Sequence, residues 1–298
     1  MPESINHISL SFLVEDMTKH WGGVAANIAF TIGKFGLHPK LMGTVGRDFN
    51  DYRDWLEKAG VDTSTVTQIG QVFTASFFAN TDLDNNQIAS FYSGAMAYSK
   101  NIKISDVLDT TPDLVVISPN DPGAMSNLAA ECRERQIKFI YDPSQQLARL
   151  DGETIKQDMD GAHLLIINAY EADMICAKTG LSMDQVRKMI DIVVVTRGDK
   201  GSSIFTNGDE IKIPIFKNTM VIDPTGAGDA YRAGFITGLA KGIDLETSGK
   251  MGALCACYVL EQIGTQNHNF SQDAFIKRFR TQFDDNGQLA YLSVEEQV

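Results

Sequence analysis

The chain has 298 residues, of which 43% are hydrophobic, so it can bury a sizeable core as one large α/β domain or two smaller ones. Its net charge of −12 argues against nucleic acid or an anionic membrane as the main partner, because both attract a surplus of Lys and Arg. Four cysteines, no secretory leader and no apolar run of about 18 residues predict a soluble protein of a reducing compartment, with the cytoplasm as the expected location. Anionic ligands must then be bound by local geometry.

The first elements combine a strand with a glycine-led helix. Alternating apolar residues over 8–14 predict a strand with one covered face. Gly22 and Gly23 precede a helix of small residues whose apolar face includes Ile28 and Ile32. Small residues let a backbone lie against a ligand, and close helix packing explains them equally well.

A strand, a helix and a hairpin follow. Residues 40–45 form an apolar strand, and Asp48 is placed to cap the next helix. Two β-rich runs, 72–80 and 87–92, flank Asp and Asn residues that suit a hairpin loop. With the run at 8–14, they predict a small separate sheet.

After Asp113 the pattern predicts a parallel sheet covered by helices on both faces, because short continuous apolar runs alternate with helical segments. These runs are 114–118, 138–141, 164–167 and 192–196. Ligands in such sheets bind beyond the carboxyl ends of the strands. The polar residues and the glycine at those ends are Asp142, Asn168, Glu171, Thr196 and Gly198.

The C-terminal part predicts helices over roughly 244–262 and 271–282. His268, in the loop between them, is expected to be solvated. Cys255 and Cys257 are two residues apart in a helical stretch and point to different faces, which argues against a metal site.

The most informative stretch is Asp223-Pro224-Thr225-Gly226-Ala227-Gly228-Asp229, which follows a strand-like run at 219–222 and opens a helix. Two glycines allow close approach of the backbone, and the N–H groups at a helix start attract an anion such as phosphate. A carboxylate beside a phosphate is unexpected, and Asp229 suits a general base for a substrate hydroxyl. An ordinary strand–helix turn with a first-turn acid explains the same residues.

Two common nucleotide motifs are absent. Gly33-Lys34 and Gly249-Lys250 lack the Ser or Thr that a P-loop requires. A dinucleotide fingerprint starting at Gly226 would need Gly or Ala where Tyr231 stands.

The remaining segments, each at a strand end or a helix start, resemble the PfkB (ribokinase-like) kinase family, and 223–229 matches a specific signature of that family. The resemblance runs from about residue 11 to the 260s. It implies one ribokinase-like domain over 1–298, a three-layer α/β/α core with a mostly parallel sheet, and a small β-sheet lid from about 6–14 and 72–92. Three details are most similar to the bacterial adenosine-kinase-like branch, namely 81–88, 94–96 and 264–268.

The resemblance implies ATP-dependent phosphorylation of a primary hydroxyl on a nucleoside, adenosine first, with a free sugar of the ribose or fructose type as the alternative. Asp229 matches the catalytic base, and Gly226, Ala227 and Gly228 match the anion hole. The segment matching the part that holds the acceptor's sugar hydroxyls contains Gly22, Gly23 and Asn27. The nucleotide-binding positions are Asn168, Thr196, Gly198 and Gly201, together with Gly226 and Gly228.

The resemblance also implies cations. Asn168 and Glu171 match the motif that helps to hold Mg²⁺, mostly through water, although an N-cap and a first-turn acid explain them as well. Positions matching Asp223, Thr225 and Gly264 bind a monovalent cation in many members, which extends the expectation to K⁺.

One departure concerns the start of the pattern. Family members begin with a strand whose Gly-rich end supplies an aspartate to the acceptor, and about thirty residues of that pattern are missing, far more than an ordinary loop. A nucleoside-binding protein without turnover is therefore an alternative. Phe73, Phe77 and Phe91 suit either the wall of a nucleobase site or packing in a homodimer through the lid.

Overall fold

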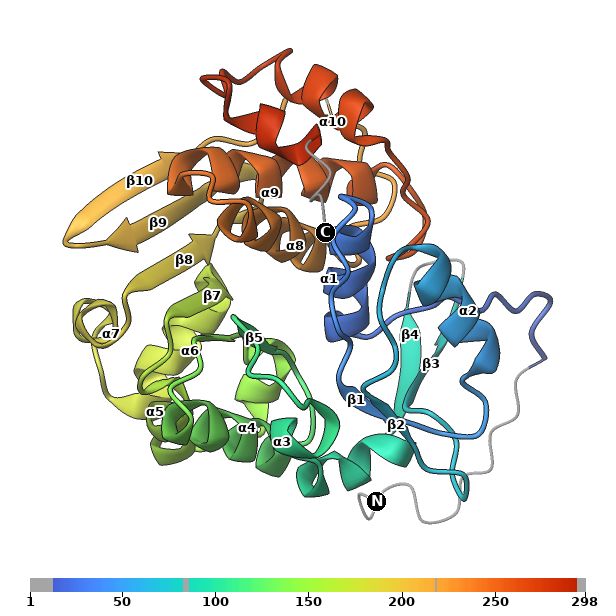
Figure 1. Ribbon diagram of the computed structural model, residues 1–298. Coiled ribbons are helices and arrows are strands. Elements are labelled where there is room, and N and C mark those ends of the chain that lie inside the picture. The colour runs from blue at the N-terminus through green and yellow to red at the C-terminus, as the bar shows by residue number, and fades with distance from the viewer. Residues whose placement is uncertain (1–12, 83–85, 218, 294–298) are drawn as a thin grey trace.

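The computed structural model describes residues 13–82, 86–217 and 219–293 (Figure 1). The first predicted lid segment, about 6–14, falls almost wholly outside these ranges. Its two described residues, Leu13 and Val14, lie in irregular chain and are exposed.

A six-stranded sheet with the order β10-β9-β8-β7-β6-β5 forms the centre of the larger lobe. Strands β5 to β8 pair in parallel, as the continuous apolar runs predict, whereas β9 and β10 add an antiparallel edge that we did not predict. The strands are β5 (Val115–Ile117), β6 (Phe139–Tyr141), β7 (Leu164–Asn168), β8 (Ile192–Thr196), β9 (Ser202–Thr206) and β10 (Asp209–Ile213).

Helices cover both faces of this sheet and give three layers (Figure 1). Alternate strand residues point to opposite faces, so that Leu165 and Val193 pack in one core while Leu164 and Val194 pack in the other. The helices of the first core are α3 (Ile104–Val107), α4 (Pro122–Glu134), α5 (Gly152–Met159), α6 (Ala169–Thr179) and α7 (Met183–Met189). The opposite layer contains α1 (Val24–Gly33), α8 (Ala227–Ala240) and α9 (Leu245–Leu260), with α10 (Gln272–Phe279) packed outside α9. The expected α/β/α layering is confirmed.

Two small sheets lie beside this core. Strands β1 (Gly43–Val45) and β2 (Val66–Gln68) pair in parallel around α2 (Asn50–Lys58). Strands β3 (Ser76–Thr81) and β4 (Gln87–Tyr92) form the predicted antiparallel hairpin. The short 3₁₀ segments are η2 (Gly94–Asn101), η3 (Ser144–Ala148), η4 (Gly198–Lys200) and η5 (Gln288–Ser293).

Three sequence-based expectations require comment. Asp48 does not cap α2, because its Oδ1 accepts hydrogen bonds from the backbone N and the Oγ1 of Thr74, both at 2.8 Å, and so fixes the start of the hairpin. The C-terminal helices are confirmed as α9 and α10, with shorter bounds than predicted. Within the described ranges, none of the helices combines the length and the hydropathy that crossing a bilayer requires.

Candidate active site

The loop before α8 is held by the Asp223 carboxylate. Its Oδ1 accepts from the Thr225 amide and its Oδ2 from the Gly264 amide, each at 2.9 Å, and these backbone bonds help to lower the pKa of Asp223 against the effect of burial. The three residues expected at a monovalent-cation site are thus brought together. The predicted strand at 219–222 is wrong, since residues 219–222 are irregular and the Ile222 amide bonds to the Leu260 carbonyl at 2.7 Å.

Gly226 is the N-cap of α8 and has φ +84°, a left-handed conformation that favours glycine. A Cβ on it would also lie 2.9 Å from Thr265 Cγ2. Because glycine offers no side-chain acceptor, α8 begins without a side-chain cap from Gly226, while the Ala227 amide donates a 3.3 Å hydrogen bond to the Pro224 carbonyl. This end of α8 therefore suits an incoming anion, as the sequence predicts.

Asp229 is the buried acid of the first turn of α8, with 9% exposure. Its Oδ2 accepts a 2.7 Å hydrogen bond from Asn27 Nδ2, and its Oδ1 lies 3.6 Å from Arg232 Nη1. Burial raises the pKa of Asp229, while the Arg232 charge and the Asn27 hydrogen bond oppose that rise. The carboxylate is thus held from two sides.

Asn27 connects this acid to the glycine-led helix. Its Oδ1 accepts from Thr265 Oγ1 at 2.9 Å and from Gln266 Nε2 at 2.8 Å. Asn27 is only 5% exposed, and one of its three side-chain hydrogen bonds goes to Asp229. Of the three residues predicted to hold the acceptor, namely Gly22, Gly23 and Asn27, it is Asn27 that contacts Asp229 directly.

The two glycines of that trio have different surroundings. Gly22 O accepts from Tyr52 Oη at 2.8 Å, which fixes the chain before α1. Gly23 is the N-cap of α1 with φ +101°, and a Cβ there would meet nothing within 4 Å. Positive φ explains this glycine, and the space beside it is open.

The predicted nucleotide-binding residues lie at the carboxyl edge of the sheet. Asn168 and Thr196 are direct partners across β7 and β8. Gly198 and Gly201 form the turn after β8, with φ values of +57° and +80°, and a Cβ at Gly201 would lie 2.2 Å from the Ile213 carbonyl.

Asn168 and Glu171 form a reciprocal capping box at the start of α6. Asn168 Oδ1 accepts from the Glu171 amide and Glu171 Oε2 accepts from the Asn168 amide, both at 2.8 Å. The alternative interpretation, an N-cap and a first-turn acid, therefore describes their local structure. Asn168 is exposed. The side-chain oxygen of Asn168 and the carboxylate of Glu171 are oxygen ligands of the kind that can hold Mg²⁺ through its bound water. Among the described residues there is no cluster of three or more His, Cys, Asp or Glu suited to a metal ion.

Sequence reasoning missed one residue of this site, Arg232. Arg232 is 7% exposed, and its Nη2 lies 2.7 Å from Asp142 Oδ1. Asp142 was predicted at the end of β6, but its partner was not. The sequence feature that could have indicated it is a single Arg, three residues after Asp229, in a helix made mostly of apolar and small residues.

The structure also corrects the prediction for His268. Its side chain is 2% exposed, its Nε2 lies 3.1 Å from Thr31 Oγ1, and burial, with a smaller contribution from Lys34, lowers its pKa to about 4. The predicted solvated histidine is therefore a buried residue that packs against α1. Cys255 and Cys257 are buried free thiols.

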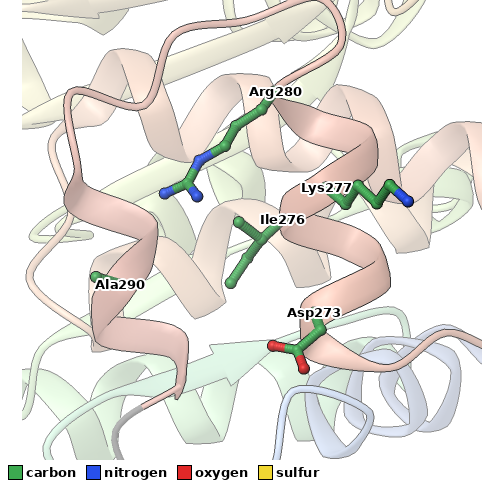
Figure 2. A pocket seen from close by; sticks show the side chains of 5 residues that line it. All are labelled: Asp273, Ile276, Lys277, Arg280 and Ala290. Carbon is green, nitrogen blue, oxygen red and sulfur yellow. The ribbon is translucent and has the colours of Figure 1, made fainter.

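Two concavities of the described residues have linings that do not include Asp229. One of about 500 Å³ lies between α10 and η5, and the Arg280 and Ile276 side chains point into it (Figure 2). Asp285 already binds the Arg280 guanidinium twice, at 3.0 and 2.8 Å. A second concavity of about 530 Å³ borders the predicted nucleotide loop and includes Arg197 and Lys200.

Comparison with known proteins identifies the family. Residues 3–272 match the family described as pfkB family carbohydrate kinase. The chain belongs to the pfkB family. It is therefore a phosphotransferase with an alcohol acceptor, as the resemblance implied.

Individual relatives of this pfkB kinase are nucleoside kinases by name. A nucleoside kinase of Methanocaldococcus jannaschii is 32% identical over 270 residues, covering 90% of this chain and 88% of the relative. The structure of Burkholderia thailandensis nucleoside kinase in complex with inosine has a TM-score of 0.86 and 33% identity, covering 92% of this chain and 90% of that one. The same enzyme in complex with ADP-inosine has a TM-score of 0.84 and 33% identity, covering 95% and 88%. The ribokinase-like fold is confirmed.

Proposed function

We propose that this protein is an ATP-dependent nucleoside kinase that phosphorylates the primary 5′-hydroxyl, with adenosine as the first acceptor to test. The observation that carries the proposal is the buried Asp229 carboxylate at the start of α8, held by Asn27 at 2.7 Å beside a helix N-terminus. Relatives named nucleoside kinases, including one with inosine bound, support a nucleoside as the acceptor.

The reaction is an in-line transfer. Asp229 takes the proton of the 5′-hydroxyl, the hydroxyl oxygen forms a bond to the γ-phosphorus of ATP, and the bond from that phosphorus to the β,γ-bridging oxygen breaks. ADP and the phosphorylated nucleoside leave, and Asp229 releases the proton to solvent before the next turnover. The amides of residues 226–228 stabilise the negative charge on the transferred group.

Two cations complete the proposal. Mg²⁺ would neutralise the nucleotide phosphates, with Asn168 and Glu171 holding its water ligands at the end of β7. The carboxylate of Asp223, bonded to the Thr225 and Gly264 amides, keeps the 223–225 and 264 loops together. The carbonyl oxygens of these loops are the donors that K⁺ would use.

The hairpin β3–β4 supplies the proposed wall for the nucleobase. Phe77 and Phe91 are direct cross-strand partners, so both side chains lie on one face. They are 65% and 56% exposed, and an apolar ring stacking on them would cover both. Packing of this hairpin against a second copy of the chain is the alternative use of the same aromatic surface.

The whole chain is proposed to act as a single domain in the cytoplasm. A sugar kinase of the ribose or fructose type is the second candidate activity, because relatives of the ribokinase type share the fold. Nucleoside binding without turnover is the third alternative.

The test is an ADP-release assay over a panel of nucleosides and free sugars, each with and without Mg²⁺ and K⁺. We expect ADP formation that depends on a purine nucleoside and on Mg²⁺. Faster turnover of ribose or a fructose derivative would favour the sugar kinase, and calorimetric binding of adenosine without ADP formation on any acceptor would favour the binding protein.

A further inference from the structure

The side chain of Arg232 returns to the first turn of its own helix. A helical side chain tilts toward the N-terminus, so Arg232 lies over residues three and four positions earlier. Those positions are Asp229 and Gly228. The guanidinium therefore lies beside the first turn of α8, where the phosphoryl site is proposed, and Arg232 as a whole is 7% exposed.

Two carboxylates contact this guanidinium from separate elements. Nη2 lies 2.7 Å from Asp142 Oδ1, and Nη1 lies 3.6 Å from Asp229 Oδ1. Asp142 follows β6, is fully buried, and has its amide bonded to the Ile117 carbonyl at 3.0 Å. The shorter contact thus joins Arg232 to a fixed point of the sheet, which leaves Nη1 directed at Asp229.

Gly228 provides an independent sign that this position of the guanidinium is built into the sequence. Gly228 is not among the positive-φ glycines, so its backbone conformation does not require glycine. A Cβ there would lie 2.9 Å from Arg232 Nη1. The absence of a side chain at residue 228 makes room for the guanidinium.

We infer that Arg232, braced by Asp142, is a positioning residue that holds the Oδ1 side of Asp229 while Asn27 holds the Oδ2 side. This inference rests on the proposed role of Asp229 as the general base. It adds a function to a residue pair that is otherwise a buried ion pair between α8 and the sheet.

The charges around Asp229 explain why a cation is needed there. Three buried carboxylates, of Asp142, Glu171 and Asp229, face one guanidinium. Burial raises the pKa of Asp229, and the Arg232 charge is the strongest opposing influence. A base must be ionised before it can accept a proton, so Arg232 extends the pH range in which Asp229 is ready to react.

The experiment measures kcat, KM and the pH dependence of kcat/KM for nucleoside-dependent ADP formation in Arg232→Met, Arg232→Lys and Asp142→Asn. Arg232→Met should lower kcat roughly 10- to 100-fold through misplacement of the base. It should also move the acidic limb of the profile to higher pH by about 1 unit, because a nearby opposite charge is lost. Burial raises the pKa of Asp142 to about 7, so Asp142→Asn removes a competing carboxyl group whose charge grows toward neutral pH, and it should move the same limb to lower pH. Arg232→Lys keeps the positive charge, so its acidic limb should lie close to that of the wild type.

The matched control is Arg135→Met at the C-cap of α4, which removes a 3.0 Å ion pair to Glu131 on the opposite face of the sheet. We expect an unchanged pH profile in this control. Where Arg232→Met does not fold, as judged by circular dichroism, Arg232→Lys and Asp142→Asn decide the question.

The outcomes separate the two proposals. Opposite shifts in the Arg232 and Asp142 variants support the positioning role. Profiles that match the wild type in both, while Asp229→Asn is strongly impaired, overturn that role and leave the proposed base intact. Near-normal turnover in Asp229→Asn overturns the base itself and, with it, the positioning role.

Discussion

The start of α8 and the β3–β4 hairpin differ in how far their side chains are already satisfied. At the start of α8, Asp229 is 9% exposed and bonded to Asn27, which is bonded in turn to Thr265 and Gln266. On the hairpin, Phe77 is 65% exposed and Phe91 56%. A two-stranded hairpin has little stability of its own. The side chains around Asp229 are therefore already in contact with one another in the isolated chain. The hairpin instead presents an exposed surface that a ligand or another chain could cover.

The largest expected effect comes from Asp229→Asn, which keeps the shape of the side chain and removes the base. We expect turnover to fall by about 10²- to 10⁴-fold with little change in the KM for the nucleoside. Steady-state kinetics of purified variants measure this. Asp273→Asn, an acid on α10 in the concavity of Figure 2, is the matched control. Comparable turnover in the two variants would remove Asp229 from the mechanism.

Acid should weaken the folded state through His268. Burial lowers its pKa to about 4 from 6.5, so between these values the unfolded chain binds a proton that the folded chain excludes. The unfolding free energy therefore falls as the pH drops through this interval, by up to about 3 kcal/mol. Urea denaturation at several pH values measures the slope.

The control for this pH effect is a comparison of two variants. His268→Gln should flatten the slope, and His38→Gln, at an exposed site, should leave it unchanged. An equal slope in wild type and His268→Gln would show that other groups cause the acid sensitivity.

Removing the Asn27 amide should damage both folding and turnover. In Asn27→Ala, Thr265 and Gln266 lose an acceptor and Asp229 loses a donor, which should cost about 1 to 3 kcal/mol of stability and lower kcat through a misplaced base. Chemical denaturation and kinetics measure the two effects. Asn127→Ala, which loses one exposed hydrogen bond to the Lys100 carbonyl, should change neither. A stable and fully active Asn27→Ala would contradict a preassembled site.

The smallest expected effect on stability concerns the hairpin. Phe77→Ala removes an exposed ring, so the unfolding free energy should change by less than about 0.5 kcal/mol, while the KM for a nucleoside should rise. Phe78→Ala alters the opposite face of the same strand and is the matched control. A rise in KM only in Phe78→Ala would assign the nucleobase to the other face. A change of oligomeric state in Phe77→Ala, measured by sedimentation, would instead favour the dimer interface.

The sequence predicts the central strands well because continuous apolar runs have few alternative positions when both faces of a sheet are covered. It predicts β9 and β10 less well, since Ser202 and Ser203 weaken the apolar pattern of β9 although both are buried. The strand expected at 219–222 fails for the opposite reason. Its apolar residues are mostly exposed, with Met220 at 69% and Val221 at 62%, and they pair with no neighbouring strand among the described elements.

For the site, local motifs indicate the glycines and acids but not their partners. Asp229 and Gly226 are recognisable from a short stretch, because the geometry of a helix N-terminus is local. The Asp142–Arg232 contact joins residues ninety positions apart, and nothing in either neighbourhood indicates the other. His268 is similar, since its burial depends on Thr31 of α1. Long-range pairs of this kind require the fold.

Product identification tests the central claim most directly. Incubation of the full chain with ATP, Mg²⁺ and adenosine, followed by ³¹P NMR and mass spectrometry, should give a nucleoside 5′-monophosphate in amounts equal to the ADP formed. Formation of ADP at the same rate without an acceptor, with no phosphorylated nucleoside from adenosine or inosine, would contradict the account.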